Sequence, residues 1–136
     1  MAGKTPQEIT RLDLGEQALE DIFQSLAKTW YDKDHFEESV ENLKKNLPPK
    51  LEQLAKFLGE RKFVLGDRIS YVDFFIYSVV DYIRLFKPEL LENQATLNAF
   101  LDRIEALPAI NAYIKSDKFY RMPITGPMSK WGFQKE

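Results

Sequence analysis

Cysteine is absent from this chain of 136 residues, and histidine occurs only once. Without cysteine the chain can form no disulfide, no thiolate nucleophile and no zinc–thiolate site. Its apolar runs are too short for the roughly 18 residues of a membrane span, and the first residues lack a signal-peptide core. The 19 lysines and arginines against 21 aspartates and glutamates argue against nucleic acid or an anionic membrane as a partner. We therefore expect a soluble, cytoplasmic protein with no nucleic-acid and no membrane partner.

The few polar patterns that could carry chemistry have simpler explanations. His35 has no serine or cysteine partner for a catalytic triad, so we interpret it as a surface residue beside a helix start. Glu37 and Glu38 follow that start, where the helix macrodipole favours negative charge. The sequence contains no glycine-rich phosphate loop and no metal-ligand cluster. We therefore expect no metal ion and no cofactor.

Apolar residues recur at helical spacing through most of the chain, and strand-like alternation is missing. This pattern predicts an all-α fold of five to six helices in one bundle, within one domain covering residues 1–136. The first helix should start at Pro6, with Thr5 as its N-cap and Glu8 completing a capping box.

The second helix should start after Asp34, with Glu37 three residues after this cap, and should end at Gly59. Pro48 and Pro49 should kink this helix or break its hydrogen-bond ladder. Further helices are expected after Thr96 and from Pro108, and the chain should be irregular from residue 117 onward.

The third helix has the clearest start signal. Ser70 is a suitable N-cap, and the Asp73 carboxylate three residues later can reach back to the Ser70 N–H in a capping box. Residues 74–80 are apolar almost all round, so this helix should be buried on most sides. We interpret Ser70 and Asp73 as structural capping residues.

Several motifs, in order and with their spacing held, resemble the C-terminal helical domain of cytosolic glutathione transferases, and most closely the mu class. They are FLGER at 57–61, GDRISYVDF at 66–74, FKP at 86–88, FLDRIE at 100–105, AYIKS at 112–116, MPI at 122–124 and WG at 131–132. The resemblance covers nearly the whole chain. It implies a helical domain that binds hydrophobic electrophiles for conjugation to glutathione, and that forms a homodimer in the full-length family.

The family begins with a thioredoxin-like α/β domain, which carries the tyrosine that stabilises the glutathione thiolate. The resemblance places residues 1–5 at the family's interdomain linker. It therefore implies that this thioredoxin-like domain is absent from the chain and that the isolated chain is inactive. Glutathione would be a co-substrate rather than a cofactor.

The resemblance also implies two residues with direct roles. Tyr31 matches the tyrosine that faces the electrophile pocket, where a phenolic O–H can donate to an oxygen or nitro group gaining charge. Asp21 matches the aspartate that reaches across the dimer to the ammonium of the neighbouring glutathione. The simpler alternatives are a surface tyrosine at a helix end and a solvated aspartate.

Six further positions fall on the family's pocket walls. On the first helix, Glu20 stands where the family usually has an apolar residue. The other five are Phe23, Gln24 and Ala27 on the same helix, and Thr125 and Gly126 where the tail covers the pocket. Trp30 and Trp131 are interpreted as packing residues.

Two other functions remain open at this point. The chain could be a non-catalytic transferase-like module for protein association, or a crystallin-like structural protein. If no second domain covers the first and third helices, some apolar residues on their faces should be exposed. The candidates are Leu12, Leu19, Phe23, Tyr71 and Phe75.

Overall fold

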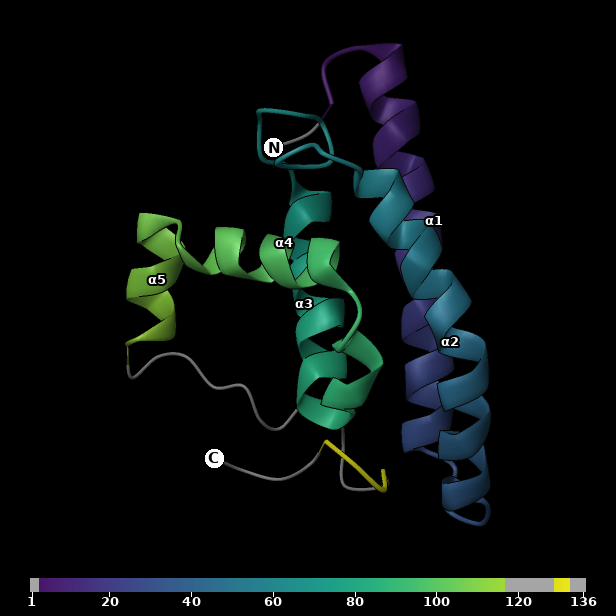
Figure 1. Ribbon diagram of the computed structural model, residues 1–136. Helices are drawn as coiled ribbons and strands as arrows, with labels where there is room; N and C mark the ends of the chain where they lie inside the picture. The colour runs from purple at the N-terminus through teal and green to yellow at the C-terminus, as the bar shows by residue number, and fades with distance from the viewer. Residues whose placement is uncertain (1–2, 117–128, 133–136) are drawn as a thin grey trace.

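The computed structural model describes residues 3–116 and 129–132, and within them the fold is all-α. The elements are α1 (Pro6–Trp30), α2 (Phe36–Leu58), α3 (Tyr71–Phe86), the 3₁₀-helix η1 (Pro88–Leu91), α4 (Ala95–Glu105) and α5 (Pro108–Ile114). The long helices α1 and α2 run side by side in opposite directions (Figure 1), and α3 packs against α1. The predicted all-α bundle is confirmed, and the only strand-like feature in the described ranges is an isolated bridge between Phe63 and Gly66.

The core lies where α1, α2, α3 and α4 meet. Each of these helices contributes a stripe of apolar residues at helical spacing, as the sequence predicts. The largest side chains that are almost fully buried are Trp30, Phe100, Leu12, Leu19, Ile22, Leu26, Leu47, Leu51, Leu54, Leu58, Ile76 and Ile83. Gly15 allows the close approach of α1 and α3, because a Cβ there would lie 3.1 Å from Cγ1 of Val72.

The start of α3 contains the capping box that the sequence predicts. The Asp73 carboxylate accepts hydrogen bonds from the Ser70 N–H at 2.7 Å and from the Ser70 hydroxyl at 3.1 Å. Its other oxygen accepts from the Val64 N–H at 2.8 Å. Burial raises the pKa of Asp73, and these donors oppose that effect. One carboxylate therefore holds both the start of α3 and the preceding loop.

Arg11 holds the same loop from α1. Its guanidinium donates to the backbone oxygen of Phe57 at 2.6 Å and to that of Val64 at 2.5 Å. It also lies 4.0 Å from the centre of the Phe57 ring, a cation–π geometry. Because the Phe57 carbonyl belongs to the last turn of α2, Arg11 satisfies an acceptor that the helix itself leaves open. One side chain of α1 thus fixes the end of α2 and the loop before α3.

The N-terminus of α1 follows the prediction with one change. The Thr5 hydroxyl accepts from the Glu8 N–H at 3.1 Å, as expected of an N-cap. The Glu8 carboxylate, however, accepts from the Lys4 N–H at 2.8 Å and pairs with Arg68 at 3.0 Å. Glu8 therefore links the first turn of α1 to the loop before α3 instead of closing the expected box on Thr5.

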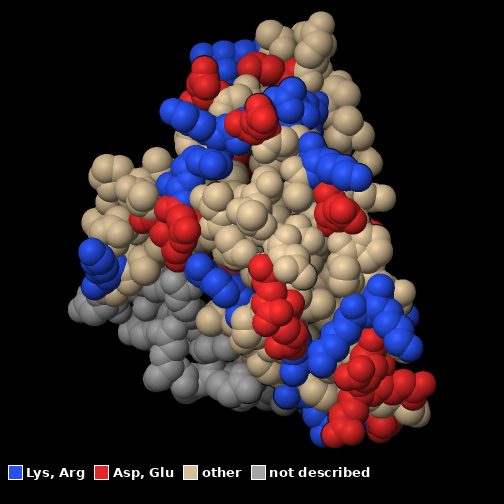
Figure 2. All heavy atoms as spheres, viewed as in Figure 1, with Lys and Arg blue, Asp and Glu red and all other residues tan. Residues whose placement is uncertain are grey.

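The prediction of Asp34 as the cap of α2 is wrong. The helix begins at Phe36, and its N-cap is His35, whose side chain is 71% exposed and makes no capping bond. The Asp32 carboxylate instead accepts from the His35 N–H at 3.0 Å and from the Ser39 hydroxyl. These two donors hold the pKa of Asp32 below its ordinary value. Acidic side chains gather at this end of α2, which lies at the lower right of Figure 2.

Pro48 and Pro49 do not interrupt α2, which runs continuously from Phe36 to Leu58. Because proline has no N–H, the carbonyls of Lys44 and Lys45 lose their usual helical donors. Gly59 ends the helix at φ 58°, a left-handed conformation that favours glycine, as predicted.

The described C-terminal segment packs against the end of α1. The Lys130 N–H donates to the carbonyl of Trp30 at 2.6 Å. The Trp131 ring lies 5.1 Å from the Trp30 ring and 4.7 Å from that of Phe86, centre to centre. The interpretation of Trp30 and Trp131 as packing residues is therefore confirmed.

The expected exposure of apolar residues on α1 and α3 is correct only in part. Leu12 and Leu19 are 2% and 0% exposed, because α1 packs its apolar stripe against both α2 and α3. Phe23 and Phe75 are half-buried, and Tyr71 is 37% exposed. The large apolar side chains most exposed on α1 are Ile9 at 49% and Leu14 at 59%.

We predict that Asp73→Ala lowers the free energy of unfolding by about 2–4 kcal/mol, because it leaves the buried N–H groups of Val64 and Ser70 without acceptors. Chemical denaturation followed by circular dichroism measures the change. Asp73→Asn keeps one acceptor oxygen and should cost less. Asp102→Ala, at an exposed position of α4, is the matched control. An unchanged denaturation midpoint for Asp73→Ala would show that the capping box contributes nothing to the stability of the fold.

We also predict that Asp32→Asn lowers the melting temperature at pH 7. The difference in melting temperature between the variant and the parent should narrow below about pH 4. The folded pKa of Asp32 lies below its unfolded value of about 3.9. Its contribution to stability is therefore present above that unfolded value and is lost as the pH falls through the folded pKa. Thermal unfolding between pH 7 and pH 2.5 tests this, and a pH-independent difference would contradict it.

Candidate functional site

Three of the predicted pocket residues lie on one face of α1. Gln24, Ala27 and Tyr31 are three and four residues apart, a spacing that places side chains in one row along a helix. Glu20 extends this row by one turn, and its carboxylate accepts a hydrogen bond from the Gln24 amide at 3.2 Å. Gln24 and Tyr31 are exposed and Ala27 is half-buried. The structure thus gathers these four residues on an accessible surface, which we call the α1 site face.

Phe23 forms the border between this face and the core. It is half-buried, and its ring lies 6.4 Å from Trp30 in an edge-on arrangement and 6.5 Å from Tyr82 of α3. The Trp30 ring in turn lies 6.3 Å from Tyr82. This packing fixes the Phe23 ring, which provides an apolar edge to the α1 site face.

Tyr31 occupies the C-cap position of α1. Its backbone N–H donates to the carbonyl of Ala27 at 3.0 Å, and the residue is 46% exposed. The residue before it, Trp30, is fully buried and is bonded through its carbonyl to Lys130. The backbone that carries Tyr31 is therefore well fixed while its side chain reaches the surface.

Asp21 lies apart from the α1 site face. It is one residue after Glu20, which turns it about 100° around the helix, towards α2. There its carboxylate pairs with Lys50 at 3.0 Å, and its side chain remains 65% exposed. Sequence analysis did not identify Lys50, because the two residues are 29 positions apart on different helices and no local pattern connects them.

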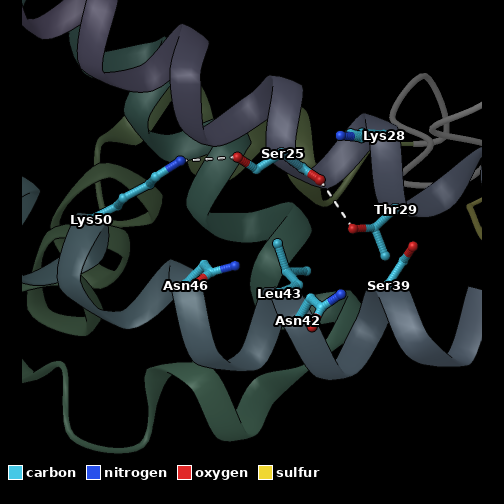
Figure 3. A pocket seen from close by; sticks show the side chains of 8 residues that line it. All are labelled: Ser25, Lys28, Thr29, Ser39, Asn42, Leu43, Asn46 and Lys50. Carbon is cyan, nitrogen blue, oxygen red and sulfur yellow. Dashed lines mark hydrogen bonds between the residues drawn. The ribbon is translucent and has the colours of Figure 1, made fainter.

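A polar groove of about 590 Å³ opens between α1 and α2 on this second side. Figure 3 shows its lining, in which Lys50 donates to the Ser25 hydroxyl at 3.1 Å and the Thr29 hydroxyl donates to the Ser25 carbonyl at 3.1 Å. The lining residues are Ser25, Lys28, Thr29, Ser39, Asn42, Leu43, Asn46 and Lys50. None of them was predicted as a site residue, so the groove is distinct from the α1 site face.

Carboxylates continue along α1 beyond the α1 site face towards its N-terminus. Glu16 and Asp13 lie one and two turns before Glu20 and close to Tyr71, the first residue of α3. Burial raises the pKa of the Tyr71 phenol, and the negative charges of Glu16 and Asp13 raise it further. Carboxylates of α1 therefore face the first turn of α3.

Two predicted pocket residues, Thr125 and Gly126, lie outside the described residues. Within residues 3–116 and 129–132, no three histidine, aspartate or glutamate side chains cluster closely enough to hold a metal ion. In the same ranges no helix is both long enough and apolar enough to cross a membrane.

Comparisons with known proteins agree with this architecture. The family model of the glutathione S-transferase C-terminal domain matches residues 20–117. Mouse glutathione S-transferase Mu 5 is 38% identical over 97% of this chain and 58% of its own length. Chicken glutathione S-transferase 2 is 40% identical over the whole chain and 61% of its own length. This chain therefore spans about 60% of the length of these relatives.

Solved structures show the same fold. The crystal structure of the glutathione S-transferase Blo t 8 matches 97% of this chain and 63% of its own, with a TM-score of 0.86 and 27% identity. A Pi-class glutathione S-transferase from Onchocerca volvulus matches 94% of this chain with a TM-score of 0.78. The sequence and structural matches run through the same helices, and this chain belongs to the glutathione S-transferase C-terminal domain family.

Proposed function

We propose that this chain is the electrophile-binding part of a mu-like glutathione transferase, which joins the glutathione thiolate to hydrophobic electrophiles. The observation that carries the proposal is that relatives named as Mu glutathione S-transferases match 97% of this chain at 35–38% identity. The α1 site face supports it, because it presents a phenol, an aromatic edge and a small residue side by side on an accessible surface.

In this proposal Tyr31 is the catalytic residue of the chain. When the thiolate attacks an electrophile, negative charge develops on an oxygen or nitro group of that molecule. A positioned O–H that donates to this charge stabilises the transition state more than the ground state. Tyr31 suits the role because its backbone is fixed by the end of α1 and its side chain is 46% exposed.

Phe23, Gln24 and Ala27 would form the pocket wall around the electrophile. Phe23 offers an apolar edge held by Trp30, and Ala27 leaves room beside it. Thr125 and Gly126 would complete the pocket from the C-terminal side. This arrangement of one polar donor among apolar walls is typical of sites for small hydrophobic molecules.

Asp21 would bind the ammonium of glutathione held by the neighbouring subunit of a homodimer. Its carboxylate is 65% exposed, and its present partner is Lys50. An exposed ion pair contributes only about 0–1 kcal/mol, so a glutathione ammonium could replace Lys50 at little cost. Asp21 and the α1 site face lie on different sides of α1. This separation agrees with the binding of two different ligands, one on each side of the helix.

The thiol-activating groups would come from the thioredoxin-like domain that precedes this domain in the family. Glutathione would then be the co-substrate, with no metal ion or other cofactor, and the enzyme would act in the cytoplasm. In this proposal the 136-residue chain binds the electrophile, and the thioredoxin-like domain stabilises the glutathione thiolate.

A fusion of this chain to the thioredoxin-like domain of a mu-class relative tests the proposal. The fusion should conjugate glutathione to an electrophile, whereas the 136-residue chain alone should not exceed the rate in buffer, because it lacks the donor that stabilises the thiolate. In the fusion, Tyr31→Phe should lower kcat/KM by about tenfold or more for an epoxide, whose oxygen gains charge.

Tyr113→Phe provides the matched control, since Tyr113 is 50% exposed on α5. It should leave the rate unchanged. A fusion that folds and binds glutathione but conjugates none of a panel of electrophiles would contradict the proposal. That result would favour a non-catalytic association module or a structural protein.

A further inference from the structure

We propose that Glu20 makes the α1 site face selective for hydrophobic cations, so that positively charged electrophiles are preferred over neutral and anionic ones. This inference rests on the proposed electrophile site and adds the charge of its substrate. Glu20 shares one row of α1 with Gln24, Ala27 and Tyr31, so its carboxylate lies beside the pocket wall and faces the same space.

The Glu20 carboxylate has a neutral hydrogen-bond partner and forms no ion pair within the described residues. Its polar contact is the neutral Gln24 amide at 3.2 Å, and no lysine or arginine in residues 3–116 or 129–132 forms an ion pair with it. Two basic side chains from outside α1 are engaged by other carboxylates of this helix. Lys50 pairs with Asp21, and Arg68 pairs with Glu8.

Neighbouring charges strengthen the same potential. Glu16 and Asp13 continue the row of carboxylates, and neither forms an ion pair within the described residues. Both lie close to Tyr71 of α3, where burial and then their negative charges raise the pKa of the phenol. A cation approaching this side of α1 is therefore attracted by several carboxylates at once.

Aromatic rings supply the second half of cation recognition. Phe23 presents a half-buried ring one turn before Ala27. Tyr31 lies one turn after Ala27 and is 46% exposed. The negative face of an aromatic ring attracts a cation, and its apolar surface accepts the carbon skeleton of the ligand. Glu20 lies one turn before the first of these rings, and a carboxylate beside an aromatic ring favours an organic cation with an apolar body.

Fluorescence titration of the 136-residue chain at low salt tests this inference with two dyes. Thioflavin T is a hydrophobic cation and anilinonaphthalene sulfonate is a hydrophobic anion. The cation should bind more tightly than the anion. Glu20→Gln should weaken the affinity for the cation about two- to fivefold, the range expected for one exposed charge pair. The same variant should strengthen the affinity for the anion. Added salt should reduce the difference, because it screens exposed charges.

Two further variants locate the effect. Glu52→Gln removes the same charge from an exposed position of α2 and should leave both affinities unchanged. Tyr31→Ala should weaken both dyes alike, which would place them on the α1 site face. Circular dichroism of each variant checks that the helices are retained.

The outcomes separate the two proposals. If both dyes bind and Tyr31→Ala weakens both, but Glu20→Gln changes neither, the electrophile site stands and the charge preference is wrong. If neither dye binds, or if Tyr31→Ala has no effect on either, this face is not a hydrophobic binding surface and both proposals fail.

Discussion

The buried carboxylate of Asp73 is the interaction on which the rest of the structure depends. It accepts hydrogen bonds from two backbone N–H groups, those of Ser70 and Val64, and so fixes the direction in which α3 leaves its loop. Because α3 packs against α1, α4 and η1, its direction determines where those elements can lie. Arg11 secures the same loop from α1, through the carbonyl of Val64. The two side chains place α1 and α3 side by side, and the α1 site face follows from that placement.

Interactions within one or two helical turns could be predicted from the sequence, whereas those between helices could not. The Ser70–Asp73 capping box and the Gly59 end of α2 depend on residues a few positions apart, so their patterns are visible in the chain. The sequence predicts Asp34 as the cap of α2, whereas in the structure Asp32 accepts the hydrogen bonds. The loop geometry decides which of these two nearby carboxylates faces the helix. Leu12 and Leu19 were among the candidates for exposure, because the sequence does not show that α1 packs on two sides.

The candidate site shows the same division. Periodicity alone places Gln24, Ala27 and Tyr31 on one face, but their proposed roles come from the resemblance to a family and from no physical pattern in the chain. The Asp21–Lys50 ion pair and the contact of Trp131 with the end of α1 join residues 29 and 101 positions apart. Such pairings require the packed structure, since the spacing of the residues along the chain carries no trace of them.

The contact between Trp30 and Trp131 has a practical consequence. These are the only two tryptophans in the chain, and their rings lie 5.1 Å apart where the C-terminal segment meets the last residue of α1. The tryptophan fluorescence of the protein therefore originates from one small region, next to Tyr31. The protein thus has a built-in optical reporter of whether its C-terminal segment is seated, and it can be read without any added label.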